Sequence, residues 1–266
     1  MLELDEQQRD LTDWALAGPT LVKGGPGSGK SIVALYRVRA LVERSVTTTG
    51  QVPRIWFATY TNPLIQTAKS LLIQLLGDLV PIRVQQLPRR IRVSTVDETV
   101  RWIAQSSQEC PGLAGREAQW DALRWARAAI KPRAMGEMEK LRISMAVRSL
   151  GDSTLMGEFE WVIEGQNCRR LDDYLAADRS GRGIPFNETV RAGVWRLYKE
   201  YCSRLKEQNL CSWGQLRQFA LELVRRDGFV RRWDHVIIDE AQDLTPAALA
   251  LCVELAREPS GVFLTA

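Results

Sequence analysis

The stretch "PTLVKGGPGSGKSIVALYRV", residues 19–38, combines a short apolar run, a glycine-rich turn and a segment with helical periodicity. Its middle part, "GGPGSGKS", matches the pattern G-x-x-x-x-G-K-[ST], with Gly24, Gly29, Lys30 and Ser31 at the fixed positions. After the turn, apolar residues recur at the spacing of one helix face. These residues are Ile32, Val33, Leu35, Val38, Leu41 and Val42. The stretch therefore predicts a strand that runs into the turn and a helix that starts from it.

This arrangement predicts a phosphate-binding loop. Glycines let the backbone curl so that successive N–H groups point at phosphates, and the following helix adds the positive end of its dipole. Lys30 would reach the β- and γ-phosphates of ATP, and the Ser31 hydroxyl would be a ligand of Mg²⁺. A chance glycine-rich turn is the alternative, which the flanking strand and helix disfavour. The loop residues expected to bind nucleotide are Gly24, Gly25, Gly27, Ser28, Gly29, Lys30 and Ser31.

Further apolar segments alternate with helical ones along the chain. Short strands are expected at 54–59, 91–95, 235–240 and 261–266. Strands that alternate with helices favour an α/β fold, in which a parallel sheet is covered by helices on both faces. Between 101 and 190 the helical segments are more polar and breakers are more frequent, which predicts an inserted, mostly helical subdomain.

Two acids follow an apolar strand in "VIIDEAQD", residues 236–243. The carboxyl ends of strands in an open α/β sheet are where ligands bind. Asp239 would hold Mg²⁺ through water, and Glu240 would accept a proton from the attacking water. Gln242 and Asp243 would either sense the γ-phosphate or couple to another site. The alternative is an acidic cap of the next helix, formed by Asp243 or Thr245. That alternative does not explain two acids directly after a strand.

Composition narrows the class of protein. The hydrophobic fraction is 45% and the net charge is +4, so the chain can bury a core and is mildly basic. No apolar run reaches the roughly 18 residues of a membrane span. The five cysteines are widely spaced and form no C-x-x-C pair, which favours reduced thiols in a cytoplasmic protein over a zinc site.

Taken together, the motifs resemble those of the superfamily 1 DNA helicases of the UvrD/Rep type. "LDEQQR" at 4–9 resembles the family's Q-motif, and the resemblance implies that Gln8 contacts adenine. "GGPGSGKS" resembles motif I, "VIIDEAQD" matches motif II, and "GVFLTA" resembles the first half of motif III. There are departures: Ile32 stands where the family often has arginine, and "SWGQL" at 212–216 replaces an acidic segment.

Two further segments resemble the family's DNA-contacting motifs. They are "ATYTNPLIQTAK" at 58–69, similar to motif Ia, and "VSTVDETV" at 93–100, similar to motif Ib. In the second, Asp97 stands where the family often has histidine. The resemblance implies contacts with single-stranded DNA by Thr59, Tyr60, Thr61, Asn62 and Thr95. The alternatives are a core role for Tyr60 and a helix cap at Asn62. For the basic clusters at 87–92 and 225–233, a solvated face is favoured over nucleic-acid contact.

The resemblance also implies a domain organisation. Residues 1–100 and 191–266 would form a RecA-like P-loop NTPase domain, called 1A, and residues 101–190 the helical insertion 1B. The expected activity is ATP-dependent translocation or unwinding. We expect full activity to need a second RecA-like domain of the same protein, whose arginines would neutralise charge on the γ-phosphate. The alternative is a nucleotide-binding sensor or partner-recruiting module that does not translocate.

Overall fold

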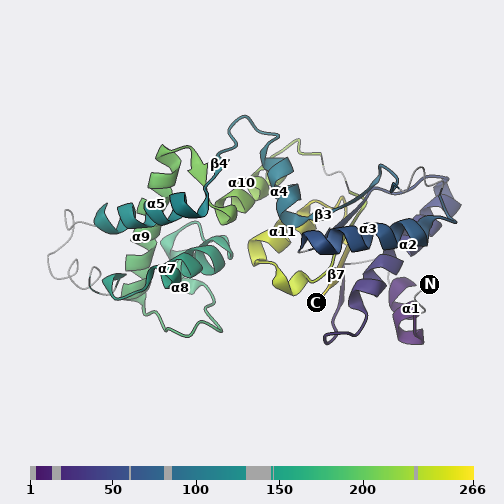
Figure 1. Cartoon of the computed structure of the whole chain (residues 1–266), viewed down its shortest axis with the longest axis horizontal. Coiled ribbons are helices and arrows are strands. Elements are labelled where there is room, and N and C mark those ends of the chain that lie inside the picture. Colours follow the sequence, from purple (N-terminus) through teal and green to yellow (C-terminus); the bar gives the residue numbers. More distant parts are fainter. Residues whose placement is uncertain are drawn as a thin grey trace. The chain divides into compact units, whose positions relative to one another are not determined.

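The computed structural model describes residues 4–13, 19–59, 61–80, 86–129, 145, 147–230 and 233–266 (Figure 1). The chain forms two compact units. The first comprises Met1–Ile103, Leu221–Leu244 and Ala248–Ala266, and the second comprises Ala104–Ala220 and Thr245–Ala247. The chain therefore leaves the first unit after its third strand and returns to it before its fourth.

The first unit is built on a parallel sheet, as predicted. Its described strands are β1 (Thr20–Val22), β2 (Ile55–Thr59), β3 (Ile91–Thr95), β6 (His235–Ile238) and β7 (Val262–Thr265). They lie in the order β1-β7-β6-β2-β3, and every neighbouring pair is parallel. Their carboxyl ends therefore meet at one edge of the sheet, where ligands bind in open α/β folds.

Both faces of this sheet are covered, because successive residues of β2 are all buried. Ile55 and Phe57 belong to the core formed with α2 (Lys30–Thr49) and α3 (Asn62–Leu76). Trp56 points to the other face, where its indole donates to Ser94 at 2.9 Å. On that face the Ser94 Oγ also lies 3.0 Å from the Thr99 Oγ1 of α4 (Val96–Ala104). The apolar character of the strand thus reflects burial from both sides.

Two further helices contribute to the first unit, α1 (Glu6–Asp13) and, from Ala248, α11 (Pro246–Glu254). The helix α1 packs against α2, and Arg37 of α2 donates to the Thr12 carbonyl at 2.8 Å. The helix α11 carries Glu254, which pairs with Arg225 at 2.6 Å. Among the described residues, no helix has both the length and the apolar character that crossing a bilayer requires.

The second unit is mostly helical, as predicted for the insertion. Its described helices include α5 (Arg116–Ala129), α7 (Asp152–Glu158), the π-helix η1 (Phe159–Glu164), α8 (Leu171–Ala176), α9 (Glu188–Glu207) and most of α10 (Trp213–Arg225). Two short strands, β4 (Gly112–Leu113) and β5 (Leu210–Cys211), pair in parallel.

The helix α9 lies in the second compact unit, whereas the sequence predicts that the insertion ends at residue 190. The helix packs against α5, and it contributes Val194, Leu197 and Tyr201 to the core of the second unit. These residues lie on one apolar face of the helix. The sequence alone does not show which other element that face packs against. The compact second unit therefore extends to Ala220.

Candidate nucleotide-binding site

The loop between β1 and α2 has the backbone geometry of a phosphate cradle. Gly27 and Gly29 have φ values of 77° and 79°, in the left-handed region that glycine adopts readily. A Cβ on Gly24 would lie 2.5 Å from the Ser28 Oγ, and one on Gly29 would lie 2.6 Å from the Gln8 Nε2. A side chain at Gly24 would displace the Ser28 hydroxyl and one at Gly29 would displace the Gln8 amide, while the positive φ of Gly29 itself favours glycine. The N–H groups of the loop, at a helix start, suit an anion.

Lys30 is the first residue of α2 and lies against this loop. Its Nζ donates to the carbonyl oxygens of Gly24 and Gly25, the latter at 3.1 Å. Ser31 follows in the first turn of α2 and is half-buried. If a phosphate were bound, its charged oxygens would replace the two neutral carbonyls as hydrogen-bond acceptors for the Lys30 ammonium group.

Gln8 lies beside the same loop, where its amide makes two local contacts. Its Nε2 donates to the Ser28 carbonyl at 3.2 Å. Its Oε1 accepts from the Asp5 N–H at 3.1 Å, while the Gln8 N–H donates to the Asp5 Oδ1 at 2.8 Å. This reciprocal pair is a capping box at the start of α1. The sequence predicts Asp5 as the N-cap of this helix, and the D-x-x-Q spacing carries the signal for the reciprocal bond from Gln8.

The acidic pair lies at the carboxyl edge of the sheet. Asp239 follows β6 directly, and its N–H donates to the Ala58 carbonyl at 2.9 Å. Its side chain is buried, and its Oδ1 accepts a hydrogen bond of 2.7 Å from the Thr265 Oγ1. Glu240 has a left-handed backbone, with φ 58° and ψ 48°, and its carboxylate accepts from the Gln242 Nε2. Gln242 is therefore placed to orient Glu240.

The strand β7 connects the glycine loop with the acidic pair. It lies between β1 and β6 in the sheet. The Ala266 N–H donates to the Val22 carbonyl at 2.9 Å, and the Gly24 N–H donates to the Ala266 carbonyl at 3.1 Å. Thr265, the preceding residue, contacts Asp239 and Glu240. The two motifs therefore share one structural neighbour, Thr265, which is not among the site residues predicted from the sequence.

The donor set suits a magnesium ion that arrives with a nucleotide. Mg²⁺ in such sites takes one or two carboxylates, water and phosphate oxygens. Asp239 offers a carboxylate at the edge where the glycine loop also lies, and Ser31 offers a hydroxyl in the first turn after that loop. Among the described residues, no group of three or more His, Cys, Asp or Glu side chains could hold a metal ion.

Four of the residues expected to contact DNA, Thr59, Thr61, Asn62 and Thr95, are described and lie at the same edge of the sheet. Thr59 and Thr95 are paired in register at the ends of β2 and β3. Thr59 is buried, whereas the Thr95 hydroxyl accepts from the Glu98 N–H at 3.1 Å and so caps α4. Thr61 is the N-cap residue of α3 and makes no side-chain capping bond; both it and Asn62 are exposed. Tyr60 lies outside the described residues.

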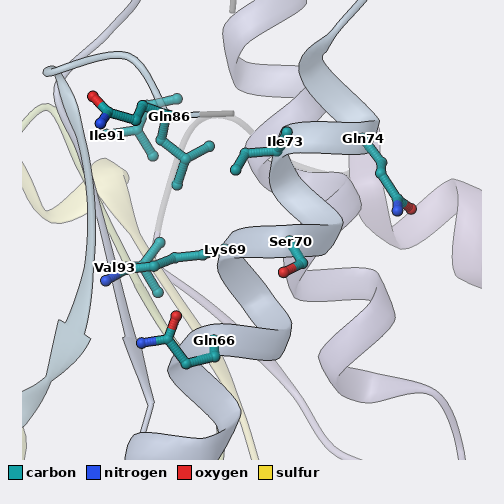
Figure 2. A pocket seen from close by; sticks show the side chains of 9 residues that line it. Gln66, Lys69, Ser70, Ile73, Gln74, Gln86, Ile91 and Val93 are labelled. Carbon is teal, nitrogen blue, oxygen red and sulfur yellow. The ribbon is translucent and has the colours of Figure 1, made fainter. Parts of the chain in front are cut away.

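A separate groove of about 580 Å³ lies between α3 and β3. Figure 2 shows Ile73 of α3 pointing toward Ile91 and Val93 of β3, with Lys69 between the two elements. The residues that line the groove are Gln66, Lys69, Ser70, Ile73, Gln74, Gln86, Leu87, Ile91 and Val93. None of the predicted site residues is among them.

Comparison with known families agrees with the geometry of the site. The sequence model of the UvrD/REP helicase N-terminal domain matches residues 4–266, a span that includes the glycine loop and the acidic pair. A comparison with curated proteins gave no match. Members of the matched family are ATP-dependent helicases that bind DNA. With its parallel sheet, its phosphate loop and its acidic strand end, the chain belongs to the UvrD/REP helicase family, of which it carries the N-terminal domain.

Proposed function

We propose that the chain binds ATP with Mg²⁺ and forms the nucleotide-binding part of an ATP-dependent single-stranded-DNA translocase or helicase. One observation supports this most strongly: β7 lies between the strand that enters the glycine loop and the strand that ends in Asp239. A nucleotide held by the loop would therefore have its phosphates near the acidic pair. In this proposal the first compact unit is the RecA-like domain 1A and the second is the insertion 1B.

Each site residue then has a separate task in hydrolysis. The loop N–H groups and Lys30 hold the β- and γ-phosphates and offset their charge. Glu240, oriented by Gln242, takes a proton from the attacking water while the water oxygen forms a bond to the γ-phosphorus. The bond from the γ-phosphorus to the bridging oxygen breaks, and ADP leaves. A magnesium ion held by Ser31 and, through water, by Asp239 would supply further charge stabilisation.

Gln8 would contact the adenine, as the family resemblance implies. For this its amide would exchange one of its local partners, Asp5 or Ser28, for the base. Such an exchange connects nucleotide binding with the start of α1. The contact would favour ATP over nucleotides whose base presents different donors and acceptors.

Single-stranded DNA would cross the carboxyl edge of the sheet. The exposed Thr61 and Asn62 offer a hydroxyl and an amide for the sugar–phosphate backbone. Tyr60 would supply an aromatic surface for base stacking. Thr59 and Thr95 lie beside this path, with the Thr95 hydroxyl engaged at the start of α4. A cytoplasmic location, where DNA and ATP are both available, follows from this proposal.

A second RecA-like domain would complete the catalytic site. Arginines supplied to the γ-phosphate from a partner domain raise the rates of related reactions by about 10³–10⁵. We therefore propose that residues 1–266 alone bind ATP weakly, hydrolyse it very slowly and do not unwind DNA.

The test measures ATP binding and hydrolysis, with and without single-stranded DNA, for residues 1–266 and for a form that includes a second RecA-like domain. We expect weak binding by the short chain and DNA-stimulated hydrolysis by the longer form. Glu240→Gln should retain ATP binding and lose hydrolysis in the longer form. Unwinding by residues 1–266 alone would contradict the need for a second domain. ATP binding without any DNA response in the longer form would favour a nucleotide-binding sensor.

A further inference from the structure

The hydroxyl of Thr265 joins the two acidic residues of the site. Thr265 is the last residue of β7 and is fully buried. Its Oγ1 donates to the Asp239 Oδ1 at 2.7 Å and accepts from the Glu240 N–H at 3.3 Å. A hydroxyl has one proton to donate, so donation to Asp239 fixes its orientation and leaves a lone pair for the Glu240 amide.

This contact matters because the backbone of Glu240 is strained. Its φ of 58° and ψ of 48° lie in the left-handed region, which costs a non-glycine residue free energy. Such a conformation persists where neighbouring groups hold it. The Thr265 Oγ1 accepts from the Glu240 amide on one side of this residue, and the Glu240 carbonyl accepts from the Asp243 N–H at 3.1 Å on the other.

We propose that Thr265 is a positioning residue, which orients the Asp239 carboxylate toward Mg²⁺ and holds Glu240 in the conformation used for hydrolysis. One Asp239 oxygen is engaged by Thr265, which leaves the other to face the metal and its water. The proposal rests on the nucleotide-binding function given above. It adds that the affinity for Mg²⁺, rather than that for the nucleotide alone, depends on this hydroxyl.

Two substitutions separate the hydroxyl from the shape of the side chain. Thr265→Val keeps the branched shape and removes both hydrogen bonds, whereas Thr265→Ser keeps the hydroxyl and loses a methyl group. Thr99→Val is the matched control. Thr99 is also fully buried, and its substitution by valine also removes a hydroxyl contact, the one of 3.0 Å between the Thr99 Oγ1 and the Ser94 Oγ. Thr99 lies outside the proposed site.

The experiment titrates the chain with a fluorescent ATP analogue, first in EDTA and then at increasing Mg²⁺. For Thr265→Val we expect the Mg²⁺ concentration at half-maximal enhancement of binding to rise about tenfold, the loss expected for a hydrogen bond to a charged group. Binding in EDTA should not change. Thr265→Ser and Thr99→Val should match the wild type at every Mg²⁺ concentration. Circular dichroism checks that each variant is folded.

The outcomes are distinguishable. A wild-type Mg²⁺ response in folded Thr265→Val would overturn this inference alone. If Thr265→Val does not fold, a folded Thr265→Ser with a weakened Mg²⁺ response would overturn it, because the hydroxyl is still present. A wild-type chain that binds no analogue at all would overturn the proposed function together with this inference.

Discussion

Glu164 at the end of η1 is a buried carboxyl that should make stability depend on pH. It is 2% exposed, and its Oε1 accepts from the Ser212 Oγ at 2.8 Å and from the Tyr198 hydroxyl at 3.3 Å. Burial raises the pKa of this carboxyl from the ordinary 4.5 to about 7, although the bonds from Ser212 and Tyr198 act in the opposite direction. The folded protein therefore binds this proton more tightly than the unfolded chain does.

The sign and size of the effect follow from this difference in pKa. Between pH 4.5 and about 7 the folded state holds more protons than the unfolded state, so the free energy of unfolding falls as pH rises. The contribution is fully present below pH 4.5 and is lost once the pH passes about 7. At about 1.4 kcal/mol per pKa unit, the whole effect is about 3 kcal/mol, most of it between pH 5 and 8.

The assay is urea unfolding followed by circular dichroism at several pH values from 5 to 8. The wild type should lose about 2.5 kcal/mol of unfolding free energy over this range through Glu164. Glu164→Gln should remove that part of the pH dependence, because its amide does not titrate. The control is Glu117→Gln, a substitution of an exposed glutamate in the first turn of α5, which should keep the wild-type dependence. A wild-type stability that does not change with pH, or an unchanged pH dependence in Glu164→Gln, would contradict a raised pKa of Glu164 in the folded chain.

Two further predictions concern the glycine loop and a buried ion pair. Gly29→Ala should lower the free energy of unfolding by about 1–2 kcal/mol and weaken ATP binding, because φ is 79° and the new Cβ would lie 2.6 Å from the Gln8 Nε2. Urea unfolding and ATP titration check this, and unchanged values in both would contradict it. Arg179→Ala should destabilise the chain by about 3–5 kcal/mol, because it leaves the carboxylate of Glu158, 1% exposed, with only the Tyr174 hydroxyl as a described hydrogen-bond donor. A loss of under about 1 kcal/mol in urea unfolding would show that this pair is dispensable.

The sheet and the positions of the glycine loop and the acidic pair were predictable because their sequence signals are local. "GGPGSGKS" needs only eight consecutive residues to specify a glycine loop at a helix start. The two acids of "VIIDEAQD" follow an apolar strand, and parallel topology then brings them to the edge where the loop lies. In both cases the chain neighbours of a residue determine its position.

The remaining features depend on partners that are distant in the sequence. In the sequence, Thr265 is only the last residue of a predicted strand. Its contact with the acidic pair depends on the pairing of β7 with β6. The face of α9 could have packed on the sheet, and only its fit to α5 places it in the second unit. For Gln8, the spacing to Asp5 predicts the cap, but its bond to Ser28 depends on where α1 packs.

The proposed function depends first on binding of the phosphates of ATP by the loop Gly24–Ser31. Isothermal titration of residues 1–266 with ATP and Mg²⁺ tests it most directly, with the wild type compared with Lys30→Ala. We expect measurable binding by the wild type and at least a tenfold loss of affinity in Lys30→Ala, because the substitution removes the ammonium group that contacts the charged phosphates. Urea unfolding should be unchanged in Lys30→Ala. Equal affinities for the two chains, or no binding by the wild type, would contradict phosphate binding by this loop.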